Sequence, residues 1–268
     1  MSTVLAALAV GIPALALALS STAVAAPGVP EPSHPGDDSA GSQILRHEGT
    51  SRTGVALPAT WGTEGVDVSS HQRNVAWSAV RKSGVRYAYI KATESTSYRN
   101  AYFAQQYNGS YKAGIIRGAY HFATPNTSSG ATQAKYFLAH GGGWSKDGKT
   151  LPGALDLEYN PYGATCYGLS HQSMVNWVRD FSRTYKAKTG RDVVLYTSTN
   201  WWKSCTGNNS GFARTNPLWV PHYGSSVGVL PAGWKLQTMW QYTSKGAAVG
   251  DHNRFNGNID RLKALANG

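Results

Sequence analysis

The chain has 268 residues, of which 41% are hydrophobic and 11% aromatic, so it can bury a substantial core and is not a wholly disordered protein. Its formal net charge at pH 7 is +11, from 25 Lys and Arg against 14 Asp and Glu. Residues 1–62 hold two of the basic and four of the acidic residues, which leaves +13 on residues 63–268 and favours an anionic partner, either a cell wall or nucleic acid.

The first 26 residues are predicted to be a secretory signal peptide. They form an apolar run rich in Ala and Leu that ends in AVAA, residues 23–26, which is the pattern of a signal and its cleavage site. A membrane anchor is the alternative, but Pro13 interrupts the run and the small residues favour cleavage. No later apolar stretch is long enough to span a bilayer. We therefore expect a secreted, extracellular protein whose mature form has no membrane span.

Residues 27–62 are predicted to be a propeptide or a disordered linker. The stretch PGVPEPSHPGDDSAGS, residues 27–42, is rich in Pro, Ser and Gly and poor in large apolar side chains. Such a composition does not bury enough surface to offset the conformational entropy that folding costs. The folded domain is therefore expected to span residues 63–268.

Beyond residue 62, β-rich runs alternate with amphipathic segments. We expect strands at residues 64–70, 85–92, 115–123, 152–160, 192–198, 217–223, 238–243 and 253–255. We expect helices at residues 75–84, 100–114, 131–140, 171–190 and 259–267. The longest of these helices follows Ser170, a suitable N-cap, and ends at Gly190.

The repeated alternation of strand and helix predicts a parallel sheet. About eight strands within residues 63–268 favour a closed β/α barrel, an α/β fold that is irregular where the last strands have short helices or none between them. A doubly wound open sheet is the alternative. No Gly-rich phosphate loop follows the first strand, which weakens the nucleotide-binding version of that alternative.

Two carboxylates alternate with leucines in ALDLEYN, residues 154–160. Residues two apart on a strand point to the same side, so Asp156 and Glu158 share one face. Both lie near the C-terminal end of their strand, where a β/α barrel has its active site, and Asp67 holds the equivalent place on the first strand. Crowded carboxylates repel, so one keeps its proton to higher pH, and a protonated acid beside an ionised one suits glycoside hydrolysis. Buried acids satisfied by Lys, Arg or backbone N–H groups are the structural alternative.

Aromatic residues gather at the same strand ends. They are Tyr120, Tyr196, Trp219, Tyr223, Trp240 and Tyr242. Their flat faces and polar edges suit sugar rings, although an ordinary core would use the same residues. The histidines have no metal-ligand spacing, so we expect no metal and no cofactor. In an exported protein the two cysteines, Cys166 and Cys205, most simply form one disulfide.

Several motifs follow the order of one enzyme family. They are GVDVSSHQ (65–72), YAYIKATEST (87–96), RGAYHFA (117–123), ALDLEYN (154–160), LYTS (195–198), MWQYT (239–243) and GDHNRFNGN (250–258). Through this order and spacing, residues 63–268 resemble the glycoside hydrolase family 25 muramidases, the Chalaropsis-type lysozymes that include forms secreted by streptomycetes. The resemblance rests on the whole series, because no single motif would be specific enough.

The resemblance implies a flattened β/α barrel with eight strands and fewer helices. It implies hydrolysis of the β-1,4 bond between N-acetylmuramic acid and N-acetylglucosamine in the glycan strands of peptidoglycan. Glu158 matches the general acid of the family, and Asp156 and Asp67 match its partner carboxylates. The positions that it implies for the cleft are Asp251, Tyr120, Tyr196 and Gln241, to which we add Trp219 as an aromatic at a strand end. We expect a monomer whose positive charge holds it on the anionic bacterial wall.

The route of hydrolysis is open between a direct nucleophile, an inverting pair and a substrate-assisted reaction. We favour the last, in which the 2-acetamido oxygen attacks the anomeric carbon, Asp156 orients the amide and the configuration is retained. A chitinase-like enzyme is a rival, but its longer Asp-x-x-Asp-x-Asp-x-Glu strand is reduced here to Asp-x-Glu. A non-catalytic wall-carbohydrate-binding protein is another, although all three acids are intact. Binding to nucleic acid would rest on charge alone, so no such partner is expected.

Overall fold

The computed structural model describes Met1 and residues 38–50, 61–246 and 248–268. The predicted signal peptide therefore lies outside the described residues, apart from Met1. Within the described part, no helix is both long and apolar enough to cross a membrane.

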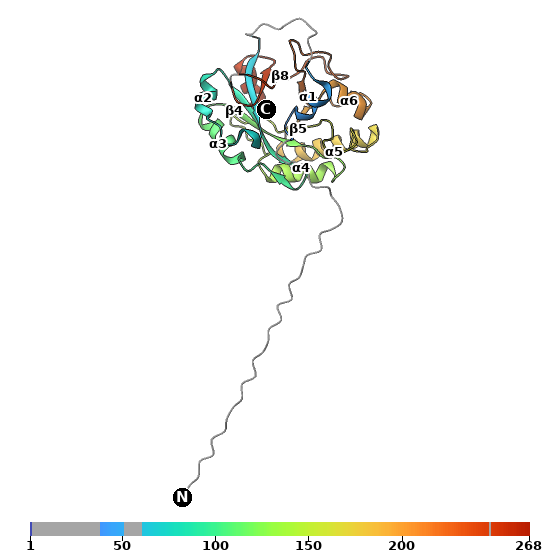
Figure 1. The fold of residues 1–268 in the computed structure, drawn as a ribbon, viewed down its shortest axis with the longest axis horizontal. Coiled ribbons are helices and arrows are strands. Elements are labelled where there is room, and N and C mark those ends of the chain that lie inside the picture. Colours follow the sequence, from blue (N-terminus) through green and yellow to red (C-terminus); the bar gives the residue numbers. More distant parts are fainter. Residues whose placement is uncertain (2–37, 51–60, 247) are drawn as a thin grey trace.

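Eight strands form a closed ring (Figure 1). In spatial order they are β1 (Thr63–Val68), β9 (Asp251–Phe255), β8 (Met239–Thr243), β7 (Leu218–Pro221), β6 (Val194–Tyr196), β5 (Ala154–Asp156), β4 (Ile116–Phe122) and β2 (Tyr87–Glu94). Pairing of β1 with β2 closes the ring, and a short β3 (Tyr98–Arg99) pairs only with the end of β2. The predicted eight-stranded barrel is confirmed.

One strand runs against the others. β9 is antiparallel to both of its neighbours, β8 and β1, whereas the remaining ring pairs are parallel. The expectation of a wholly parallel sheet was wrong here. Only residues 244–250 connect β8 to β9, which is too short a link for the crossover that a parallel strand needs.

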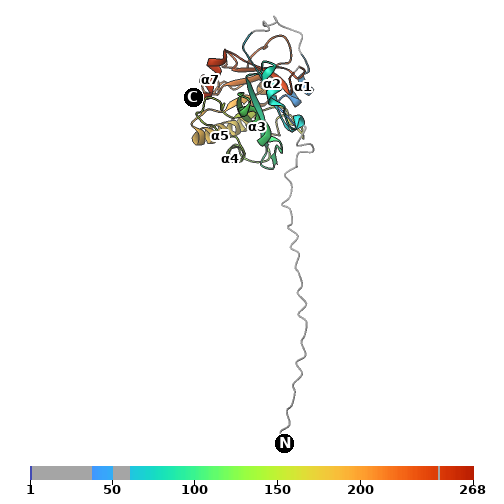
Figure 2. The ribbon, with the colours of Figure 1, turned by 90° about the vertical axis from the view of Figure 1, so that its left-hand side faces the viewer.

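Seven α-helices occur in the described residues. They are α1 (Ser42–Glu48), α2 (Trp77–Lys82), α3 (Phe103–Lys112), α4 (Gly130–Ala139), α5 (His171–Thr189), α6 (Thr199–Thr206) and α7 (Ile259–Asn267). α4 and α5 lie side by side in both views (Figures 1 and 2), joined by a bond from the Ala131 N–H to Asp180. The predicted caps of α5 are confirmed, since the Ser170 side chain accepts the Ser173 N–H and Gly190 ends the helix at φ 73°.

Sequence analysis missed α1 and α6. The Ser198 side chain caps α6 by accepting the Trp201 N–H, and Trp201 and Trp202 are fully buried. α1 lies within residues 27–62, and it is held by the barrel, against which Ala40 and Ile44 are buried. A disordered linker therefore does not describe residues 38–50. The propeptide expectation for this range stays a prediction.

The core has an inner and an outer layer, which together fix the direction of the β5 side chains. Leu155 and Leu157 belong to the outer layer, with the apolar faces of α4 and α5. Ala154 belongs to the inner layer, among the aromatic side chains that fill the barrel. Since side chains alternate along a strand, Asp156 faces inward, as Ala154 does.

Candidate active site

Four carboxylates meet at one rim of the barrel. Asp156 is the last residue of β5, Glu158 follows two positions later, and Asp67 lies near the end of β1. Asp251 begins β9 and stands opposite Asp67 in the antiparallel register, so the reversed strand delivers its first residue to this same rim. Asp67, Asp156 and Glu158 are all at least 97% buried. The structure thus brings together the acids that the sequence singled out.

Burial raises the pKa of each acid, and repulsion by a neighbouring carboxylate adds to the rise for Asp156 and Asp67. Burial is the larger cause for Asp156 and Asp67, followed by the charge of Glu158 on Asp156 and the charge of Asp251 on Asp67. Burial raises the pKa of Glu158 to about 8, opposed by backbone N–H groups that donate to it, and raises the pKa of Asp251 to about 7. At neutral pH the cluster therefore holds protons that isolated carboxyls would have lost.

Asp156 is the least satisfied member of the cluster. Among the described residues, its buried side-chain oxygens have no donor apart from the neighbouring Glu158 carboxyl, with which Asp156 shares a hydrogen bond. Two buried carboxyls that depend on each other for a hydrogen bond cost free energy, so their retention in a fold is a sign of use. Its oxygens are available to a donor that arrives with a ligand.

Asp67 is held by two amide side chains. Its Oδ2 accepts bonds from Asn253 Nδ2 at 2.7 Å and from Gln241 Nε2 at 2.9 Å. The Gln241 amide is oriented in turn, because its Oε1 accepts the hydroxyls of Tyr196 at 2.8 Å and Tyr223 at 2.7 Å. Sequence analysis predicted Tyr196 and Gln241 at the cleft but missed Asn253, whose only signal was its place within the GDHNRFNGN motif.

Trp219 lies beneath the site rather than in its wall. Its ring is fully buried, stacked on Tyr89 at 4.9 Å and edge-on to Tyr196 at 4.7 Å. Its indole N–H donates to Asn253 Oδ1 at 2.7 Å. In this position it supports Asn253 and the tyrosines from below. Tyr120 is also buried, and its hydroxyl accepts the N–H of Ala40 at 3.2 Å.

Comparison with known proteins identifies the architecture. The family model for glycosyl hydrolases family 25 matches residues 66–251. Lysozyme M1 of Streptomyces globisporus is 48% identical over 94% of this chain and 90% of its own. The N,O-diacetylmuramidase of a Chalaropsis species is 51% identical over 76% of this chain and 99% of its own. A solved bacterial lysozyme from Streptomyces coelicolor is 52% identical, with a TM-score of 0.76 over 78% of this chain and 98% of its own.

The chain belongs to glycosyl hydrolase family 25. The predicted family is therefore confirmed, and the protein is a glycoside hydrolase. The solved Streptomyces coelicolor chain also shows how much of this chain such a fold needs, since 98% of that solved chain matches only 78% of this one.

In this family 25 hydrolase the N-terminal segment occupies the mouth of the barrel. Figure 1 shows α1 beside β5 and α6, and the backbone N–H groups of Gly41 and Gln43 donate to the two oxygens of Glu158. Lys91 of β2 lies at one side of the mouth, fully buried, where its ammonium is 2.6 Å from Glu94. Sequence analysis missed this ion pair, because nothing in YAYIKATEST marks its lysine as buried.

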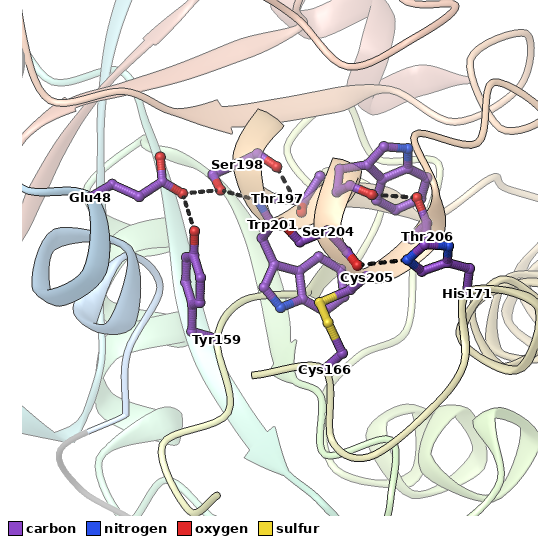
Figure 3. Close-up of a disulfide and its surroundings, with 11 residues drawn as sticks. Glu48, Tyr159, Cys166, His171, Thr197, Ser198, Trp201, Ser204, Cys205 and Thr206 are labelled. Atoms are coloured by element: carbon purple, nitrogen blue, oxygen red, sulfur yellow. Dashed lines mark hydrogen bonds between the residues drawn. A yellow bond between two sulfur atoms is a disulfide. The ribbon is translucent and has the colours of Figure 1, made fainter. Parts of the chain in front are cut away.

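The predicted disulfide is confirmed. Cys166, in the loop after β5, is bonded to Cys205 of α6 (Figure 3). It ties the loop that follows the acids of the family 25 site to the helix whose first turn adjoins α1. Within the described ranges, no group of three His, Cys, Asp or Glu is arranged to hold a metal ion.

Proposed function

We propose that the chain is a lysozyme that hydrolyses the β-1,4 bond between N-acetylmuramic acid and N-acetylglucosamine in peptidoglycan. Relatives at about half identity carry the names lysozyme and N,O-diacetylmuramidase. The observation that carries the proposal is the pairing of Glu158, whose pKa burial raises to about 8, with Asp156, whose buried oxygens have no donor in the described structure other than the Glu158 carboxyl. Glu158 can therefore donate a proton, and the oxygens of Asp156 can accept a hydrogen bond from the substrate.

Glu158 acts as the general acid in this proposal. A protonated carboxyl donates to the glycosidic oxygen as the bond to the leaving sugar breaks, and the proton goes with that oxygen. The departing oxygen leaves an electron-poor anomeric carbon. Asn253 and Gln241 hold Asp67 at the cleft and favour its ionised form, and in that form its negative charge stabilises the developing cation.

Asp156 accepts the N–H of the 2-acetamido group in the same proposal. That bond orients the amide so that its oxygen attacks the anomeric carbon from the face opposite the leaving group. Water then opens the resulting ring, and Glu158 takes a proton back as general base. Two displacements at one carbon retain its configuration. NMR of the first product is expected to show the β-anomer, and an initial α-anomer would contradict this route.

Clearing of a bacterial wall suspension tests the proposal. The protein to use is a chain of residues 61–268, called the barrel chain below. It starts at Trp61 because the carbonyl of that residue accepts a hydrogen bond from Arg254. Removing the acid by Glu158→Gln is expected to lower the clearing rate roughly 10²–10⁴-fold, the usual contribution of general acid catalysis. The matched control is Asp260→Asn, an acid-to-amide change at an exposed side chain of α7, and it should leave the rate unchanged. Equal clearing by Glu158→Gln and the control would refute the assignment.

We further propose that the enzyme is a secreted monomer, that residues 1–26 are its signal peptide, and that residues 27–62 are a propeptide. Peptidoglycan strands are its substrate, and the +13 charge of residues 63–268 holds it on the anionic wall. The signal-like run and the position of α1 outside the matched family region support these assignments. Mass spectrometry of the protein recovered from culture medium tests them, since an N-terminus at or before residue 26 would contradict removal of the signal.

A further inference from the structure

Residues 38–50 contact the proposed general acid through their backbone. Oε1 of Glu158 accepts the Gly41 N–H at 2.9 Å, and Oε2 accepts the N–H groups of Gln43 at 2.8 Å and Ile44 at 3.1 Å. Both oxygens are thereby engaged. A glycosidic oxygen has to come within about 2.6–3.2 Å of this carboxyl to take its proton. The segment and the substrate therefore exclude each other at Glu158.

The same segment uses the other polar groups of the cleft. The carbonyl of Ala40 accepts Gln241 Nε2 at 2.9 Å, and its N–H donates to the Tyr120 hydroxyl at 3.2 Å. Gln241 also donates to Asp67. Three of the residues that we assign to catalysis or substrate binding, Glu158, Gln241 and Tyr120, thus bind the backbone of one short stretch, in which Ala40 is fully buried.

Acidic side chains anchor the stretch at both ends. Asp38 receives the Tyr162 hydroxyl on its carboxylate and the Lys91 ammonium on its carbonyl. At the other end Glu48 accepts Asn200 Nδ2 at 2.9 Å and the Tyr159 hydroxyl at 3.0 Å, and also a bond from Ser198 (Figure 3). The anchors span the mouth from β2 to the start of α6.

Gly41 makes the fit possible. Its φ is 93°, a left-handed conformation that residues with a Cβ rarely adopt. A Cβ at this position would lie 1.9 Å from the Tyr223 hydroxyl oxygen and 2.5 Å from Gln241 Oε1. The backbone can therefore approach the floor of the cleft only because residue 41 is a glycine, the one glycine between Ala40 and Glu48.

We propose that residues 38–50 are an intramolecular inhibitor of this hydrolase, which a cut of the chain between residue 50 and β1 would release. This inference rests on the proposed function. While the segment is attached, its effective concentration at the cleft is in the millimolar range, so modest contacts keep it bound. After the cut it dilutes, and the polymeric substrate displaces it.

The test compares clearing rates of residues 27–268, residues 61–268 and two variants of the longer chain. The longer chain should clear walls at least about tenfold more slowly than the barrel chain, the effect of only 1.4 kcal/mol of docking. Gly41→Ala should restore most of that rate, because the added methyl group cannot fit. Arg46→Ala, on the exposed side of α1, is the matched control and should stay as slow as the parent.

Two further measurements keep the outcome decisive. A synthetic peptide of residues 38–50 should inhibit the barrel chain, and the same peptide with Gly41→Ala should not. Amide hydrogen exchange of residues 27–268 should show protection at Gln43 and Ile44 that Gly41→Ala removes, a readout that needs no activity. Equal clearing by the long and short chains, or unprotected amides in the parent, would overturn the inhibitor. A folded barrel chain that clears no walls, beside protected amides, would instead overturn the proposed function.

Discussion

Glu158 and Asp156 have the same chemistry and lie two residues apart, yet their surroundings differ. Three backbone N–H groups of residues 38–50 donate to Glu158, whereas Asp156 has no donor among the described residues other than the Glu158 carboxyl. The three donors favour the charged form of Glu158, so burial is what raises its pKa and suits it to the role of an acid. The proposed chemistry depends on the placement of Asp156 inside the barrel, next to Glu158.

The pH dependence of kcat should report the ionisation of Glu158. Its protonated form is the active one, and burial raises its pKa to about 8. Activity is thus present at low pH and lost as pH rises through the pKa of Glu158. The value of about 8 belongs to the carboxyl beneath residues 38–50; bound substrate buries the carboxyl again, so the kcat of the barrel chain, rather than its kcat/KM, should fall at a pH above the usual value for a glutamate. The barrel chain is the form to measure, on soluble glycan fragments, and a kcat limb falling near pH 4.5 would show that Glu158 is not perturbed.

Asp156→Asn should separate activity from stability. We expect kcat of the barrel chain to fall roughly 10²–10³-fold, the loss typical of one electrostatic contact to the transition state. The folded-state pKa of Asp156 is raised, so its stabilising effect is present at low pH and is lost as pH rises through that pKa. At pH 8 the neutral amide should therefore raise the melting temperature, by about 2–4 °C per kcal/mol, and at pH 4 by much less. Calorimetry at both pH values checks this, and equal shifts would contradict it.

Among the elements, α6 and β9 contribute most to the shape of the site. β9 reverses direction and so brings Asp251 and Asn253 to the rim that the parallel strands form. α6 begins at Ser198, which both caps the helix and binds Glu48 of α1. A link of seven residues and a single cap thus set the positions of groups that lie far apart in the sequence.

The disulfide should stabilise the loop after β5 against α6. Cys166 and Cys205 are 39 residues apart, and in the chain-entropy model a loop of that length stabilises by about 4 kcal/mol. Replacing both by serine should lower the free energy of unfolding by up to that amount in a urea titration. Clearing by the barrel chain below its melting temperature should change little, since neither cysteine is in the acid cluster. Loss of activity with stability retained would show instead that the bond positions the site.

At the scale of the whole molecule, two properties bear on the encounter with a bacterial wall: the net charge of the barrel and the covering of its cleft by residues 38–50. In our proposal the +13 charge of residues 63–268 attracts the barrel to an anionic wall, while residues 38–50 lie on the groups that would bind glycan. Attraction to the wall does not require an open cleft. We therefore expect binding to walls and cleavage of walls to be separable properties of this enzyme.

Salt should weaken clearing of walls without slowing the chemistry. Exposed charges are screened over about 10 Å at 0.1 M salt and about 3 Å at 1 M. We expect the barrel chain to clear intact walls several-fold more slowly at 1 M than at 0.1 M salt, with hydrolysis of a soluble, uncharged fragment nearly unchanged. An equal loss on both substrates would place the salt effect in the active site and contradict a role for the net charge in wall attachment.

The sequence by itself determined the local features of this protein. Apolar periodicity located the eight strands of the ring and five of the seven helices in the described residues, and a period of two placed Asp156 and Glu158 on one face. Ordered motifs gave the family, which the comparisons confirm. The elements and the shared face depend on neighbours within a few residues, and the family on the order of motifs along the chain, so the sequence contains the information for both.

Only the tertiary structure decided which distant groups meet. Glu158 bonds to the backbone of Gln43, 115 residues away, and Asp67 bonds to Asn253, 186 residues away. Residues 38–50 have too few apolar side chains to fold alone, and composition therefore predicted no structure for them. They are ordered because the barrel supplies the donors, acceptors and apolar surface that they lack. That contribution comes from the assembled barrel, whose surface no local pattern in residues 38–50 describes.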